Sequence, residues 1–191
     1  MTDIFKLKVE EIVSKIKDAQ LTSVEVCKEY IDRIKKFEKD VKAWAHFDKK
    51  LLLEKAEEAD QHRRSGKPTG SLHGIPIALK DIIGTVDMPT ECGTPIRKGK
   101  SYSQNAEIVD LLLSAGAIVM GKTATSELAY LGPSKTTNPH DYSRTPGGSS
   151  SGSAASVASF MAPLSIGSQT GGSVLDLHLI VGWLVINHHT D

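Results

Sequence analysis

Apolar positions in the first sixty residues recur every three or four residues, the spacing of one face of a helix. The segment Thr22–Glu25 is a capping box, in which a hydroxyl and a carboxylate satisfy free N–H groups at a helix N-terminus. Shorter helices are predicted over about 6–17 and 51–64, and a short strand around Trp44–Phe47. The longest periodic run, directly after the capping box, is Val24, Cys27, Ile31, Ile34, Phe37 and Val41.

Beyond Gly66 the pattern changes to short apolar runs separated by glycine and serine. Ile75–Leu79 and Ala117–Met120 are apolar and bounded by turn residues, which is typical of buried strands. Helical spacing returns over 105–115, and an Ala/Ser-rich helix is predicted over 153–161. Helices that alternate with buried strands predict an α/β fold.

Charge and glycine divide the chain at the same point. Residues 1–66 hold 29 of the 46 charged residues and one of the 16 glycines. The sequence therefore predicts an N-terminal helical segment over 1–66 that packs on a core domain over 67–174. Residues 175–191 form a tail of a different character.

Composition excludes several classes of protein. The 23 basic and 23 acidic residues balance, whereas a broadly basic nucleic-acid binder needs surplus Lys and Arg. No run of about 18 apolar residues predicts a membrane span. The first residues lack the apolar run of a signal peptide, so a cytoplasmic protein is expected. Cys27 and Cys92 cannot make a disulfide framework and are interpreted as buried thiols.

Two motif matches fail on physical grounds. Gly116–Thr123 fits the phosphate-loop pattern, but a helix precedes it and its middle residues have strand character. Gly148–Gly152 fits the nucleophile elbow of α/β-hydrolases. The acid and histidine which that enzyme class needs occur only in the tail, as Asp176 followed by His178, His188 or His189.

Three segments carry candidate chemistry: Gly74–Asp81, Pro146–Ser153 and Gly167–Ser173. Lys80 follows an apolar strand, and burial would lower the pKa of its amine so that it could act as a general base. Serine needs such a base to become a nucleophile. Glycine pairs let backbone N–H groups approach a developing oxyanion. The set suffices for acyl transfer without histidine.

From Gly74 to Val174 the chain resembles the amidase signature family of serine hydrolases. The segments that carry the resemblance are GIPIALKD, GAIVMGKTATSELA, TPGGSSSGSAASVA and GSQTGGSV. The resemblance implies an α/β amidase-signature fold, a mixed β-sheet core flanked by helices, of which this chain carries the N-terminal part.

The resemblance also implies roles for single residues. Lys80 would be the base, Ser149 the bridging serine, usually preceded by a cis peptide bond, and Ser173 the nucleophile of a Ser–Ser–Lys triad that forms an acyl-enzyme. Ser150 would orient the loop. No metal or cofactor is implied. The oxyanion hole is expected from the backbone N–H groups of Thr170, Gly171 and Gly172.

The implied substrate is a small-molecule carboxamide, with no direct contact to nucleic acid or membrane, and a homodimer or amidotransferase subunits as partners. The alternative is the A subunit of an aminoacyl-tRNA amidotransferase, which releases ammonia from glutamine. Its members usually have Asp where this chain has Gln169, which favours a general amidase. A non-catalytic fragment is the third hypothesis.

The resemblance stops after Val174, where the family continues with an Arg-Pro pair. When residues 175–191 are back-translated and read in a shifted frame, the codons permit a sequence that resembles the family. We therefore hypothesise a frame shift near codon 175. Sequencing the DNA would test it. The alternatives are a natural strand over 179–186 and a histidine metal site. If the chain is truncated in this way, the isolated polypeptide is expected to be poorly stable and inactive.

Overall fold

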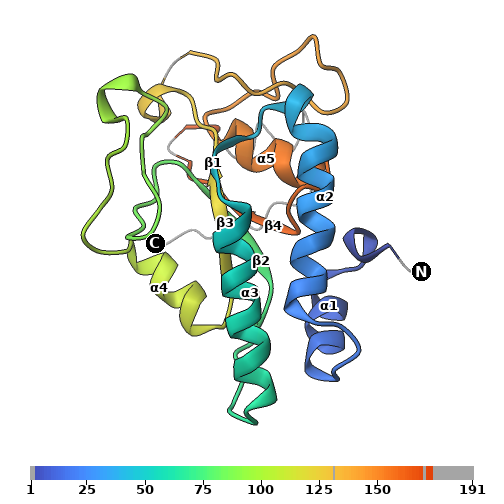
Figure 1. Cartoon of the computed structure of the whole chain (residues 1–191). Helices are drawn as coiled ribbons and strands as arrows, with labels where there is room; N and C mark the ends of the chain where they lie inside the picture. Colours follow the sequence, from blue (N-terminus) through green and yellow to red (C-terminus); the bar gives the residue numbers. More distant parts are fainter. Residues whose placement is uncertain (1–2, 131, 170, 174–191) are drawn as a thin grey trace.

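A four-stranded mixed sheet lies at the centre of the chain (Figure 1). The structure is a computed structural model that describes residues 3–130, 132–169 and 171–173. Strand β2 pairs in parallel with β3 and β4, and β1 pairs antiparallel with β3. This arrangement confirms the predicted α/β class with a mixed sheet. In spatial order the strands are β1 (Trp44–Phe47), β3 (Ile118–Thr123), β2 (Pro76–Lys80) and β4 (Leu164–Ile166).

The helices confirm the periodic pattern, with boundaries moved by a few residues. In the described residues they are α1 (Val9–Lys17), α2 (Ser23–Val41), α3 (Lys49–Arg64), α4 (Glu107–Ser114) and α5 (Ser151–Ala158). Three single 3-10 turns accompany them, namely η1 (Ile4–Lys6), η2 (Pro95–Arg97) and η3 (Glu127–Ala129). None of the described helices has the length and apolar character that crossing a membrane requires.

Helices α2 and α3 run side by side (Figure 1), and α3 also contacts β3. Helix α5 packs against β2, β3 and β4. Every residue of the two central strands, β2 and β3, is buried. The apolar core therefore extends from the N-terminal helices into the sheet, and the division of the chain at Gly66 stays a prediction.

The conformation of β3 bears on the phosphate-loop pattern that was rejected for Gly116–Thr123. Its residues Gly121, Lys122 and Thr123 lie in the strand, paired with β1 and β2. A phosphate loop instead wraps free backbone N–H groups around an anion. Pairing in the sheet uses these backbone groups, so the rejection is confirmed.

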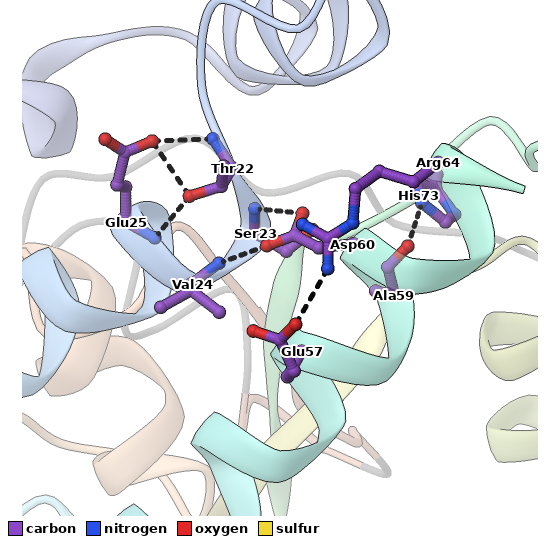
Figure 2. Close-up of polar contacts among 9 residues, drawn as sticks. All are labelled: Thr22, Ser23, Val24, Glu25, Glu57, Ala59, Asp60, Arg64 and His73. Carbon is purple, nitrogen blue, oxygen red and sulfur yellow. Dashed lines mark hydrogen bonds and ion pairs between the residues drawn. The ribbon is translucent and has the colours of Figure 1, made fainter.

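The N-terminus of α2 is fully capped (Figure 2). The first four N–H groups of a helix have no partner within the helix. Thr22 and Glu25 satisfy two of them reciprocally, which confirms the capping box. Asp60 of α3 accepts from the N–H groups of Ser23 at 2.8 Å and Val24 at 3.2 Å, and is 1% exposed. One carboxylate thus joins α3 to the start of α2.

We expect Asp60→Ala to lower the free energy of unfolding by about 2–4 kcal/mol, because two buried N–H groups lose their acceptor. Glu57→Ala is the matched control on the same helix. It removes a 2.7 Å ion pair to Arg64 between half-exposed side chains, and should cost less than about 1 kcal/mol. Urea denaturation of both variants measures the difference, and equal losses would contradict the capping role of Asp60.

Candidate functional site

The candidate residues gather where the parallel strands end. The carboxyl ends of β2, β3 and β4 lie at the same edge of the sheet because these strands run in the same direction. Lys80 is the last residue of β2, and Ser168 follows the end of β4 by two residues. Ser149 and Ser150 lie immediately before α5. Residues from three separate segments therefore meet at one edge.

Lys80 is fully buried among hydroxyl and carbonyl groups. Its side chain is 0% exposed. Its Nζ donates to Ser149 Oγ at 2.7 Å, to Ser168 Oγ at 2.9 Å and to the Ser168 carbonyl at 3.3 Å. No ion pair among the described residues includes Lys80. Burial without a carboxylate partner lowers the pKa of the Lys80 amine to about 8.

The loop before α5 depends on two glycines. Gly147 and Gly148 have φ values of 81° and 54°, in the left-handed region that glycine adopts without strain. They bring Ser149 to Lys80, and the Ser149 carbonyl accepts from the N–H of Ser126 at 3.3 Å. The bond between Gly148 and Ser149 is trans, unlike the cis bond that the resemblance implies, as are all peptide bonds of the described residues.

Ser150 connects the two serine-bearing loops. Its Oγ donates to the Ser168 carbonyl at 2.9 Å and accepts from the Ser168 N–H at 3.2 Å. Its own N–H donates to the Ser173 carbonyl at 3.4 Å. These contacts are those that a loop-orienting residue would make.

Ser173 lies beside this group through its backbone. Within the part of the chain that the structure describes, its hydroxyl has no hydrogen bond to Ser149 or Lys80. Gly171 is exposed and Gly172 is half-buried, whereas Thr170 lies outside the described residues. The structure therefore brings Lys80, Ser149 and Ser150 together, and places the expected nucleophile next to Ser150 without the final hydrogen bond.

Sequence reasoning missed Ser168. It contacts both Lys80 and Ser150 and contributes two of the three acceptors of the lysine. Its signal in the sequence was its place in the Gly167–Ser173 motif, directly after an apolar strand. Only the sheet pairing of β4 with β2 brings it to the lysine.

Metal binding gains no support from the described residues, among which no group of three or more His, Cys, Asp or Glu side chains could hold an ion. The histidine cluster suggested for the tail, His178, His188 and His189, lies outside the described residues, as does Asp176. The hypotheses on the tail 175–191 therefore stay predictions.

Comparisons with known proteins all point to the same protein family. The Amidase family model matches residues 25–175. The A subunit of the glutamyl-tRNA(Gln) amidotransferase of Streptomyces coelicolor is 39% identical over 182 residues, covering 91% of this chain and 36% of the relative. The same protein of Rhodococcus erythropolis is 40% identical over 183 residues, covering 91% of this chain and 37% of the relative.

Solved structures agree with the sequence relatives. The peptide amidase of Stenotrophomonas maltophilia has a TM-score of 0.87 at 34% identity, covering 93% of this chain and 39% of that one. A fatty acid amide hydrolase has a TM-score of 0.85 at 28% identity, covering 91% of this chain and 32% of that one. The chain thus spans less than two fifths of the length of these proteins. The family match over 151 residues and the shared fold show that the chain belongs to the amidase signature family.

Proposed function

We propose that this chain carries the base, the bridging hydroxyl and the nucleophile of an enzyme that hydrolyses carboxamide C–N bonds. The observation that supports the proposal most is the environment of Lys80. It is a fully buried amine, 2.7 Å from the Ser149 hydroxyl, with only neutral acceptors around it. Such surroundings favour the neutral amine, the form that a lysine acting as a base near neutral pH requires, and the short contact with Ser149 gives it a hydroxyl to act on.

The proposed reaction begins with proton transfer. Neutral Lys80 takes the hydroxyl proton of Ser149 while Ser149 takes that of Ser173, so the net transfer is from Ser173 to Lys80. Ser173 Oγ bonds to the amide carbon as the carbonyl π electrons move to oxygen. Backbone N–H groups of Gly171 and Gly172, with that of Thr170, would hold this oxyanion.

The second half of the reaction runs the relay in reverse. The tetrahedral intermediate collapses, the C–N bond breaks, and the leaving nitrogen takes a proton from the Lys80 ammonium through Ser149. The products are ammonia or an amine and an ester on Ser173. Water then attacks the ester with the same relay, giving a carboxylic acid and free Ser173. Ser150 and Ser168 touch the relay residues and would hold their loops in place.

A second candidate is specific to glutamine. The sequence relatives described above are named as the A subunit of a glutamyl-tRNA(Gln) amidotransferase. In that role the carboxamide would be that of glutamine, and the ammonia would pass to partner subunits. The chemistry at Lys80, Ser149 and Ser173 is the same for both candidates, so they differ only in substrate and partners.

Phosphonylation tests the shared chemistry directly. A fluorophosphonate reacts with an activated serine hydroxyl, forming a P–O bond with loss of fluoride, and needs no amide-binding groups. Even if the purified 191-residue chain hydrolyses no amide, we expect it to be labelled, with the added mass mapped to Ser173 by peptide mass spectrometry. Ser173→Ala should abolish the label.

A chain that folds but stays unlabelled, or is labelled equally at other serines, would contradict the proposal. Ammonia release from glutamine against release from simple carboxamides, with and without the partner subunits of a relative, then separates the two candidates. Release that is specific for glutamine and depends on those subunits favours the amidotransferase role.

A further inference from the structure

A second buried lysine lies one strand away from the first. Lys122 of β3 is 0% exposed, and its Nζ donates to Thr90 Oγ1 at 2.7 Å and to the carbonyl of Ile83. It pairs with Leu79 in the sheet, next to the pair of Lys80 and Thr123. Because neighbouring residues of a strand point to opposite faces, the two lysines leave the sheet on opposite sides. The proposed reaction does not use Lys122.

Keeping Lys122 buried costs free energy. Burial lowers the pKa of its amine to about 8, and the groups that act on its charge are Asp81, Cys92 and Asp87. Among the described residues none of these carboxylates forms an ion pair with it. An apolar side chain of similar length would fill the same space without a desolvation penalty. The contacts of the amine therefore call for a reason beyond packing.

Those contacts close a loop. Ile83 and Thr90 both belong to loop 81–94, which follows β2, and Lys122 forms hydrogen bonds with both of them. Asp81 makes a second closure. Its carboxylate accepts from the N–H groups of Glu91 at 3.2 Å and Gly93 at 3.5 Å. Loop 81–94 is thus fixed to the strand ends by one buried cation and one buried carboxylate.

This loop reaches the candidate site at two points. Asp81 directly follows Lys80 in the chain, so the base of the loop sets where β2 ends. At the other end, the Cys92 carbonyl accepts from the N–H of Leu128 at 2.8 Å. The same turn supplies Ser126, whose N–H donates to the Ser149 carbonyl at 3.3 Å. A displacement of the loop would therefore move the backbone on both sides of the contact between Lys80 and Ser149.

We propose that Lys122 is a positioning residue of this site, which closes loop 81–94 on β3 and thereby fixes Lys80 and Ser149 relative to each other. The inference rests on the proposed function for its kinetic consequence. Its structural consequence, the closure of the loop, can be measured without any activity.

The test compares Lys122→Met with Lys98→Met, an exposed lysine that follows the same loop. In Lys122→Met we expect the limiting rate of Ser173 phosphonylation to fall about 10- to 100-fold, since displaced reacting groups react more slowly. The half-saturating probe concentration should stay within about threefold of wild type because the probe contacts are unchanged. Hydrogen exchange at Glu91–Gly93 should accelerate at least about tenfold as the loop opens. Lys98→Met should change none of these quantities.

Thr90→Val carries the test if Lys122→Met does not fold, because it removes only one acceptor of the amine. It should shift both readouts in the same direction by a smaller factor. Unchanged exchange in the loop, or an unchanged limiting rate in a chain with an open loop, would overturn the proposal. A wild-type chain without label at Ser173 would instead contradict the proposed function, and loop exchange alone would then decide whether Lys122 closes the loop.

Discussion

Lys80→Met is expected to slow phosphonylation of Ser173 by about 10²–10⁴-fold, the range for loss of a general base. Methionine fills the space of the lysine stem but accepts no proton, so Ser149 would have nowhere to pass the proton of Ser173. The rate is measured at saturating probe from the growth of the labelled peptide. Lys100→Met, at an exposed position, is the control for a change of net charge.

The pH dependence gives this prediction a second readout. The amine becomes a base only after losing its proton, and its pKa in the folded chain is lowered to about 8. Labelling of the wild type should therefore rise with pH, reach half its maximum near pH 8 and level off above it. In Lys80→Met the residual rate should lack this rise. A wild-type rate that does not change between about pH 6 and pH 10 would contradict the role of Lys80 as the base.

Stability separates loss of the base from loss of the fold. The pKa of Lys80 falls from 10.5 to about 8 on folding, so the unfolded chain binds more protons between these values. Stability from this group rises as pH increases through that window, and the full penalty of the buried ammonium is present below pH 8. Lys80→Met removes this penalty, which is at most about 3 kcal/mol at about pH 7, but it also removes the donor to three oxygen atoms, so the net gain in stability should be smaller. A slower but more stable variant cannot owe its rate to unfolding.

The elements of the fold were predictable because their signals are local. The stripe from Val24 to Val41 and the capping box at Thr22 both lie within the helix that they define, and that helix forms as α2. The capping contribution of Asp60 was not predictable, since it comes from 37 residues away and depends on how α3 packs. The order of the strands and the antiparallel pairing of β1 with β3 also arise from packing. The spacing of apolar residues along the sequence carries no information about either.

The residues of the site likewise divide into those that nearby sequence could predict and those that depend on distant parts of the chain. The apolar run of β2 ends on Lys80, so its burial could be inferred from its neighbours in sequence. Its partner Ser149 lies 69 residues away, and only the family resemblance paired the two. Ser168 was missed because its contact with Lys80 requires β4 to lie beside β2. Lys122 stood in a rejected motif, and its role depends on a loop from another part of the chain.

Gly152→Ala is expected to be strongly destabilising. A Cβ at this position would lie 2.4 Å from both the Ala124 nitrogen and the Ala43 oxygen, and 2.7 Å from the Ala124 oxygen. All three are backbone atoms, so no side chain can rotate away. Alanine favours a helix over glycine by about 1 kcal/mol, but the overlap should outweigh that gain, leaving a net loss of about 2–4 kcal/mol.

The consequence of that overlap reaches the site because α5 begins directly after Ser150. To relieve it, α5 must move away from the end of β3, and Ser149 moves with it, away from Lys80. Urea denaturation should show the loss of stability, and phosphonylation of the remaining folded chain should slow as well. Gly171→Ala is the matched stability control, since no atom lies within 4 Å of its Cβ position. If both alanine variants unfold at the same urea concentration, the close approach of α5 to the backbone at Ala43 and Ala124 does not hold the helix in place.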